Sequence, residues 1–205
     1  MQGGVNPELK LDWYTDLISK LRTSHPTIDL DCFSPIEIEG IAEVCDLSTS
    51  EVLLSLKNAG MHGLPGGGAE MLVDSVRMDI SPKKGSADNW IRGMREAQDN
   101  GLTTSPTNDI GFGESRADRI LHMDRIRSAQ DNAISSGNIG FTSFISWPVQ
   151  LENNVFGARN RGDNRTRLGA SSTEYLRHVA VSRICLLYTS PSPRDRTRSR
   201  MPSSA

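Results

Sequence analysis

The sequence predicts an α/β fold in which a parallel sheet carries functional loops at its strand ends. Short apolar runs alternate along the chain with segments of helical periodicity, which is the order of strand–helix repeats. Several predicted helices begin with capping residues directly after a strand, and glycine-rich or polar loops follow the strands. Because ligands bind at the carboxyl ends of parallel strands, those loops are the candidate site.

Composition limits the classes of function. The chain has 205 residues with 36% hydrophobic and 23% charged residues, as in ordinary globular proteins. No apolar run approaches the ~20 residues of a membrane span, and no secretory leader is recognisable, so we expect a cytoplasmic protein without a membrane partner. The cysteines, at positions 32, 45 and 185, lack CxxC spacing, and the four histidines are scattered, so we expect no metal site in this sequence.

The last part of the chain differs from the rest. Residues 185–205 lose apolar periodicity and are rich in Ser, Pro and Arg, a composition typical of disordered tails. Residues 185–195 back-translate into a transposase sequencing adapter, and residues 199–205 into the flow-cell end of the same adapter. We therefore expect one domain over residues 1–184 and translated read-through over 185–205. Without that tail the formal charge moves from −2 to −5, which argues against a nucleic-acid partner.

The first helix is predicted to begin at Asn6, with Pro7 at its first helical position. A short strand over residues 28–33 follows, and Ser34-Pro35-Ile36-Glu37 predicts a helix that opens with a capping box. A second capping box at residues 48–51 predicts a helix that ends at Gly60. The first helix has apolar residues at helical spacing, which predict its buried face: Trp13, Tyr14, Leu17, Ile18 and Leu21.

A glycine loop follows the next strand, predicted over residues 61–64. Three glycines after Pro65 allow backbone N–H groups to approach a ligand closely. Residues 69–73 predict a helix, which would place Glu70 in its first turn beside a polar or anionic ligand. A tight loop with a charged first turn is the simpler alternative. No Gly-Lys-Ser/Thr follows the glycines, so this is not a Walker loop.

The second half repeats the pattern. A helix around Trp90 is predicted to end at Gly101, and a strand from Leu102 leads into a glycine-bearing loop at residues 109–114. The helix after that loop carries apolar residues that we expect to be buried: Ile120, Leu121, Ile126 and Ala129.

Another strand is predicted where residues 141–147 alternate, and Trp147 at its end suits either the core or a stacking role. The polar loop at residues 153–169 is either a solvated loop or a lid in which one arginine binds a carboxylate. Ser171 and Glu174 predict the start of a last helix. The arginines of the polar loop are Arg159, Arg161, Arg165 and Arg167.

Five motifs in this order and spacing resemble the radical S-adenosylmethionine (SAM) family of menaquinone synthesis that cyclises dehypoxanthine futalosine. The similarity covers most of residues 2–184. The motifs are Gln2-Gly3-Gly4-Val5-Asn6-Pro7, Phe33-Ser34-Pro35-Ile36-Glu37-Ile38, Leu64-Pro65-Gly66-Gly67-Gly68-Ala69-Glu70, Ile80-Ser81-Pro82-Lys83-Lys84, and Phe141-Thr142-Ser143-Phe144-Ile145-Ser146-Trp147-Pro148-Val149-Gln150.

The resemblance implies a partial (β/α) barrel of the TIM type with its site at the C-terminal face. It implies SAM and a [4Fe–4S] cluster as cofactors, a 5′-deoxyadenosyl radical that abstracts a ribose hydrogen, and an electron donor such as flavodoxin or ferredoxin. The cluster cysteines, CxxxCxxC, lie outside this fragment, and the C-terminal part of the family is also absent. We therefore expect the isolated chain to fold poorly, with unpaired sheet edges, and to be inactive.

The resemblance also implies roles for individual residues. The cofactor-binding positions are Gln2, Gly3, Gly4, Ser34, Gly66, Gly67 and Gly68. The substrate-binding positions are Pro65, Glu70, Trp147, Gln150, Arg159 and Arg161, with an arginine pairing with the substrate benzoate. The catalytic acid or base is not assigned, and Glu70 and Asp109 are the candidates.

Other functions remain open at this point. Single motifs are shared with the aminofutalosine synthase and with the deazaflavin synthase, although Gln-Gly-Gly combined with Trp-Pro-Val-Gln favours the cyclase. A non-catalytic α/β module that holds a nucleotide-like ligand on the glycine loop is the alternative from another class. That module would have no CxxxCxxC upstream.

Overall fold

The computed structural model describes residues 1–160 and 168–186, and all structural statements refer to those residues. Within them no helix is long and apolar enough to cross a membrane. In chain order the elements are α1 (Leu11–Ser24), α2 (Pro35–Cys45), α3 (Thr49–Ala59), β1 (Gly63–Gly66), α4 (Asp74–Ile80), the 3₁₀ turn η1 (Pro82–Lys84), α5 (Ala87–Asp99), β2 (Thr103–Ile110), α6 (Arg116–Ser135), β3 (Ile145–Pro148), α7 (Val155–Arg159) and α8 (Ser172–Cys185).

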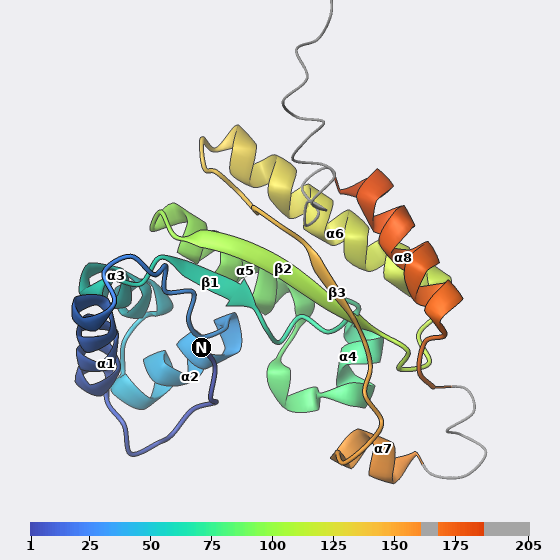
Figure 1. The fold of residues 1–205 in the computed structure, drawn as a ribbon, viewed down its shortest axis with the longest axis horizontal. Coiled ribbons are helices and arrows are strands. Elements are labelled where there is room, and N and C mark those ends of the chain that lie inside the picture. The colour runs from blue at the N-terminus through green and yellow to red at the C-terminus, as the bar shows by residue number, and fades with distance from the viewer. Residues whose placement is uncertain (161–167, 187–205) are drawn as a thin grey trace, which may run out of the picture.

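The strands form a parallel sheet in the order β1-β2-β3. An isolated parallel bridge between Asp31 and Gly63 places the segment before α2 beside β1. In Figure 1, α1, α2 and α3 gather at the β1 side, and α6 and α8 pack together at the β3 side. The predicted α/β class with a parallel sheet is confirmed, and the barrel stays a prediction.

Strand β2 separates the two faces of the sheet. Its residues alternate between buried and partly exposed along the whole strand, as the two-residue period of a strand requires. Thr104, Asn108 and Ile110 are buried on the helix-covered face. The alternate residues, Ser105, Thr107 and Asp109, line a cleft on the other face.

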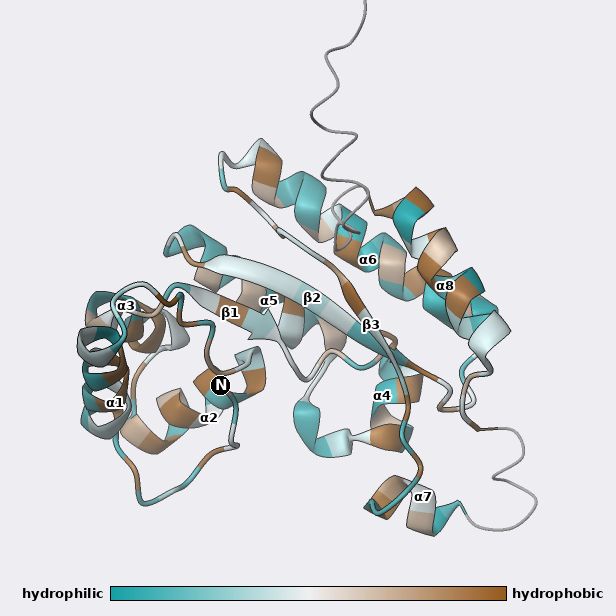
Figure 2. Cartoon of the chain, in the orientation of Figure 1, coloured by the Kyte–Doolittle hydropathy of each residue, from teal (hydrophilic) through white to brown (hydrophobic). Residues whose placement is uncertain are grey.

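The core lies between the sheet and its helices. Trp90 and Met94 of α5 and Ile18 of α1 are fully buried in it. In Figure 2, α2 shows many apolar residues, and α6 shows polar and apolar residues in turn. Leu186 is also fully buried in this core, and residues 187–205, most of the proposed read-through, lie outside the described residues.

The predicted N-caps Ser34, Ser48 and Ser171 are confirmed. The full capping box predicted at Ser34 is not formed, because the Glu37 carboxylate binds the Ser34 hydroxyl and the amides of Gly3 and Gly4. Ser48 and Glu51 form both arms of a capping box at α3, which ends at Gly60 with φ of 114°. Ser34 and Ser171 each accept a hydrogen bond from the third helical residue of α2 and α8. These motifs were predictable because both partners lie within one turn.

Three predictions in the first half were wrong. Helix α1 begins at Leu11 rather than at Asn6, because Asn6 accepts hydrogen bonds from Glu8 and Leu9 in a separate turn. Trp13 is 47% exposed, so the buried face of α1 turns toward Tyr14 and Ile18. The strand at residues 28–33 is reduced to the single bridge at Asp31.

Two predictions further along were also wrong. Residues 69–73 are not helical, and α4 begins only at Asp74, so Glu70 is not in a first helical turn. Its φ of 33° is left-handed, which is incompatible with the predicted helix. In α6, Ile120 and Leu121 are exposed, whereas Ile126 is buried as predicted and Ala129 is partly buried. The helix also buries Met123.

Candidate functional site

A cleft of about 940 Å³ is lined by residues of the sheet and of the loops at its strand ends. In Figure 1, α5 lies behind the sheet, and the lining residues of β2 alternate with those that face the helices. Ser105, Thr107 and Asp109 of β2 form its floor, and Ile145 and Trp147 of β3 continue it. Trp147 is 55% exposed and offers an aromatic face to a ligand rather than filling the core.

The glycine loop forms one wall of the cleft. Gly67 and Gly68 are lining residues, and Gln2 reaches them from the chain start, since a Cβ on Gly67 would lie 2.4 Å from Gln2 Nε2. Trp90 Nε1 donates to the Gly67 carbonyl at 3.2 Å and fixes the loop from behind. Gly66 has another role: a Cβ there would lie 2.4 Å from the Ser105 carbonyl, so glycine is required for β1 to pack on β2.

Glu70 lies in the same wall and forms an ion pair with Lys84. Its other carboxylate oxygen, Oε2, is buried with no hydrogen-bond partner among the described residues. Such an atom carries a desolvation cost that a ligand donor would relieve.

Asp109 is the third charged residue of this group. Burial raises the pKa of its carboxyl from 3.8 to about 6, and the Glu70 charge adds to the rise while Lys84 opposes it. The Asp109 amide also donates to the Glu70 carbonyl at 2.8 Å, which ties the two acidic residues together. A carboxyl with this pKa can exchange a proton near neutral pH.

The predicted cofactor motif at the chain start has an internal partner. The amides of Gly3 and Gly4 both donate to Glu37 Oε1 at 2.8 Å. Ser34 caps α2 and donates its hydroxyl to Glu37 Oε2 at 2.8 Å. Glu37 is therefore the residue that orders this motif, which the capping pattern alone did not reveal.

The structure brings together eight of the predicted site residues in the described lining. These are Gln2, Pro65, Gly67, Gly68, Glu70, Asp109, Trp147 and Gln150. The lining does not include Gly3, Gly4, Ser34, Gly66 or Arg159, and Arg159 is exposed at the end of α7. Arg161, Arg165 and Arg167 lie outside the described residues.

Sequence reasoning missed part of the lining. Lys84 stood in a motif used for the resemblance but was given no role, because its partner Glu70 is 14 residues away. Phe112 and Phe156 were also missed; their rings pack edge to face, 5.3 Å apart, at one end of the cleft. They come from the β2–α6 loop and α7, so no local pattern connects them.

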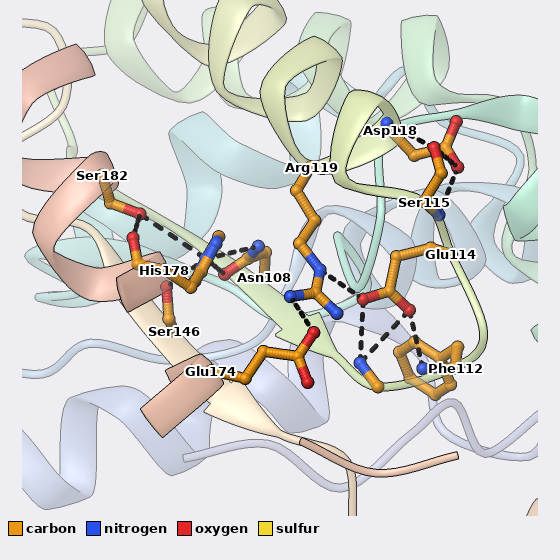
Figure 3. Close-up of polar contacts among 11 residues, drawn as sticks. Asn108, Phe112, Glu114, Ser115, Asp118, Arg119, Ser146, Glu174, His178 and Ser182 are labelled. Carbon is orange, nitrogen blue, oxygen red and sulfur yellow. Dashed lines mark hydrogen bonds and ion pairs between the residues drawn. The ribbon is translucent and has the colours of Figure 1, made fainter. Parts of the chain in front are cut away.

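Behind the sheet, a separate polar cluster joins β2 and β3 to α8 (Figure 3). His178 Nε2 lies 3.2 Å from both Asn108 Nδ2 and Ser146 Oγ. Ser182 donates to the His178 carbonyl at 2.9 Å. Burial lowers the pKa of His178 to about 4, with the Arg119 charge as a further cause, so the imidazole is neutral at pH 7.

An ion-pair network adjoins this cluster (Figure 3). Arg119 Nε donates to Glu114 at 2.6 Å, and its Nη1 donates to Glu174 at 2.8 Å. The fully buried Glu114 carboxylate also accepts from the amides of Gly111 and Phe112. The network thereby links the β2–α6 loop to α6 and α8.

The described residues contain no group of three or more His, Cys, Asp or Glu side chains that could hold a metal ion. The three cysteines are free and far apart in the sequence. The [4Fe–4S] cluster that the resemblance implies therefore does not fit the side chains of this part of the chain.

Comparison with known proteins gives a consistent picture. The chain is 41% identical over 186 residues to the cyclic dehypoxanthine futalosine synthase of Halalkalibacterium halodurans. It is 34% identical over 186 residues to the aminodeoxyfutalosine synthase of Thermus thermophilus. It is 35% identical over 193 residues to a 5-amino-6-(D-ribitylamino)uracil–L-tyrosine 4-hydroxyphenyl transferase of Microcystis aeruginosa.

These alignments cover 91% of this chain but only 47%, 48% and 50% of the three relatives. The chain thus spans about half the length of the curated relatives it matches. No protein-family model matches the chain. The resemblance predicted from the five motifs is nonetheless confirmed: over 91% of its length the chain is similar to a cyclic dehypoxanthine futalosine synthase, to an aminodeoxyfutalosine synthase and to a uracil–tyrosine 4-hydroxyphenyl transferase.

Proposed function

We propose that this chain is part of a radical SAM enzyme that cyclises dehypoxanthine futalosine to cyclic dehypoxanthinyl futalosine on the route to menaquinone. The observation that carries the proposal is the 41% identity to a cyclic dehypoxanthine futalosine synthase over 91% of the chain. The cleft supports it, because its size suits a nucleoside-like ligand and eight residues of the expected site line it.

The cofactor proposal has a physical test within this chain. SAM, when bound with a reduced cluster, supplies the radical that starts such ring closures. Gln2, Gly67 and Gly68 are the residues that would hold it, and the unpartnered Oε2 of Glu70 suits a ribose hydroxyl. The described side chains do not form a binding site for the [4Fe–4S] cluster. We therefore propose that its cysteine ligands, in a CxxxCxxC motif, lie outside this sequence.

The described residues would contribute binding, exclusion of water and proton exchange. Trp147, Phe112 and Phe156 would cover an aromatic ligand and keep water from it. Asp109, with its pKa of about 6, would hold or release a proton at its carboxyl oxygen as the ring forms. An arginine at position 159 or 161 would pair with the substrate carboxylate.

The test begins with the DNA that flanks this reading frame, amplified again from the source. CxxxCxxC upstream and a barrel continuation in place of residues 185–205 would allow the complete enzyme to be made. That enzyme, with SAM, a reductant such as flavodoxin and dehypoxanthine futalosine, should give the cyclic product by mass spectrometry. No product from a cluster-loaded enzyme would refute the cyclase proposal.

The sister activities are the second candidate, because the aminodeoxyfutalosine synthase and the uracil–tyrosine transferase are 34% and 35% identical to the chain. The same complete enzyme would distinguish them, since each sister acts on a different substrate. Single Arg159→Ala and Arg161→Ala variants should raise the apparent KM for dehypoxanthine futalosine. Unchanged kinetics in both would remove the arginine from the proposal.

A further inference from the structure

Arg77 of α4 is a buried cation with an unusual set of partners. It is 2% exposed, and its guanidinium donates to four main-chain carbonyls, those of Gly68, Ala69, Lys84 and Gly85, at 2.7–3.1 Å. Two of these carbonyls belong to the glycine loop and two to the turn after α4. The planar five-donor guanidinium can span such a set, whereas an ammonium cannot.

The loops that Arg77 joins carry the Glu70–Lys84 ion pair. In the glycine loop, Glu70 directly follows the two residues whose carbonyls bind Arg77. In the turn after α4, Lys84 itself provides one of the carbonyls. Glu70 has φ of 33°, a strained conformation for a residue with a side chain. Its main chain is fixed by Arg77 and by the Asp109 amide, and its carboxylate by Lys84, so it is restrained from three directions.

The charges around Asp109 depend on this arrangement. The neighbouring strands β1 and β3 carry no ionisable side chain in their bounds. Glu70 and Lys84 are the charged groups that act on the Asp109 carboxyl, with opposite signs. Asp31 and the N-terminal amine of Met1 line the same cleft. The position of Lys84 therefore decides how much of the Glu70 charge reaches Asp109.

We propose that Arg77 and Lys84 are positioning residues that hold the Glu70 carboxylate beside Asp109, so that both carboxyls face one ligand donor group while the Lys84 ammonium pairs with Glu70. The occupant of that position is a hydroxyl or an ammonium, because the free Oε2 of Glu70 can only accept a hydrogen bond. The inference deepens the proposed function, since it rests on the cleft being the active site.

A purely structural role accounts poorly for these features. Burial lowers the pKa of the Arg77 guanidinium even though the carboxylates of Glu70, Asp74 and Glu39 act against that shift, and the left-handed φ at Glu70 adds to the cost of this arrangement. The restrained Glu70 carboxylate nonetheless retains a buried oxygen with no partner among the described residues. Strain and unmet polar groups of this kind concentrate at ligand-binding sites.

The first test follows the Asp109 carboxyl by carbon-13 NMR titration in the complete enzyme, before its cluster is loaded. Lys84→Met should raise the Asp109 pKa by roughly one unit, because the Glu70 charge is no longer neutralised. Glu70→Gln should lower it, because the repelling charge is gone. Lys83→Met is the matched control: Lys83 is exposed in the same turn and outside the cleft lining, so the pKa should not move.

The second test uses the complete enzyme. Arg77→Lys keeps the charge but cannot reach four carbonyls, so kcat should fall roughly 10–100-fold by misplacement of Glu70. Arg95→Met, which removes an exposed arginine of α5, should leave kcat unchanged. The Asp109 titration provides a readout that does not need the cofactor. If Arg77→Lys displaces Glu70, the pKa of the Asp109 carboxyl should change in that variant as well.

The outcomes separate this inference from the proposed function. Opposite pKa shifts in Lys84→Met and Glu70→Gln support the inference even if the complete enzyme proves to act on a sister substrate. An Asp109 midpoint that moves in neither variant, with both folded by circular dichroism, would overturn it even if the enzyme is a cyclase. If Lys84→Met does not fold, Glu70→Gln decides, because an unmoved midpoint there excludes the charge coupling.

Discussion

Asn108 and Asp109 are neighbours on β2, but their side chains lie on opposite faces of the sheet and in different environments. Asn108 is fully buried behind the sheet, where its side-chain amide lies within hydrogen-bond distance of His178. Asp109 faces the cleft, where burial and the Glu70 charge raise its pKa to about 6. The protein thus provides a hydrogen-bond partner for Asn108, whereas it disfavours the charged form of Asp109.

The same contrast extends to the groups around each residue. Behind the sheet, the buried carboxylate of Glu114 accepts from Arg119 and from two backbone amides. In the cleft, one oxygen of Glu70 has no partner among the described residues. The Glu114 carboxylate is therefore saturated by the protein, whereas Glu70 keeps hydrogen-bonding capacity that a ligand donor could meet. This difference predicts opposite effects of substitution.

The largest effect is expected behind the sheet. Arg119→Met should lower the free energy of unfolding by about 3–5 kcal/mol, because it leaves the buried Glu114 without its cation and frees Glu174. Urea denaturation measures the change. Arg95→Met removes an exposed pair at 3.9 Å and should cost at most about 1 kcal/mol. Equal losses in the two variants would contradict a structural role for the network.

Asn108→Ala should cost about 1–3 kcal/mol, since it leaves the His178 ring with one fewer partner in a buried site. The loss should appear at pH 7 in the same denaturation assay. A variant as stable as the parent would mean that the cluster is not saturated by the protein.

Asp109→Asn, one residue further along, should have the opposite sign. The folded-state pKa of about 6 lies above the ordinary 3.8, so the folded carboxyl holds its proton more tightly and stability falls as pH rises from about 4 to about 6. Replacing the carboxyl should therefore stabilise the chain by about 1–3 kcal/mol at pH 8. Destabilisation at that pH would place Asp109 with the structural residues.

The effect of His178 on stability appears only as the pH is lowered below 6.5. Its folded-state pKa of about 4 lies below the ordinary 6.5, so the unfolded chain binds the proton first and stability falls as pH is lowered from 6.5 to about 4. His178→Gln should reduce that slope by up to about 1.4 kcal/mol per pH unit. Parallel stability–pH curves for the two proteins would mean that the ring does not titrate as its burial requires.

The sequence supported those features that depend on near neighbours. The capping residues Ser48 and Ser171 were predictable because each acts on a residue three positions later. The strand predicted from Leu102 is observed as β2. Since the two-residue period of a strand places alternate residues on opposite faces, it also positions Asp109, once the face covered by helices is known.

Features that depend on distant contacts could not be predicted. The segment after the glycine loop has helical composition, but Arg77 takes the carbonyls of Gly68 and Ala69 that a helix would have used. Lys84 and Phe156 enter the cleft from separate elements, so their roles appear only in three dimensions. Trp13 had the spacing of a core residue, yet α1 packs through Tyr14 and leaves Trp13 47% exposed.

The hydrogen bonds between Glu37 and the start of the chain have a consequence for local opening of the structure. One carboxylate oxygen holds the amides of Gly3 and Gly4 from 34 and 33 residues away, while the other binds the hydroxyl that caps α2. The glycine turn and the first turn of α2 should therefore open as a single unit. Their amide hydrogens would then exchange with solvent at one common rate, and loosening either end would release both.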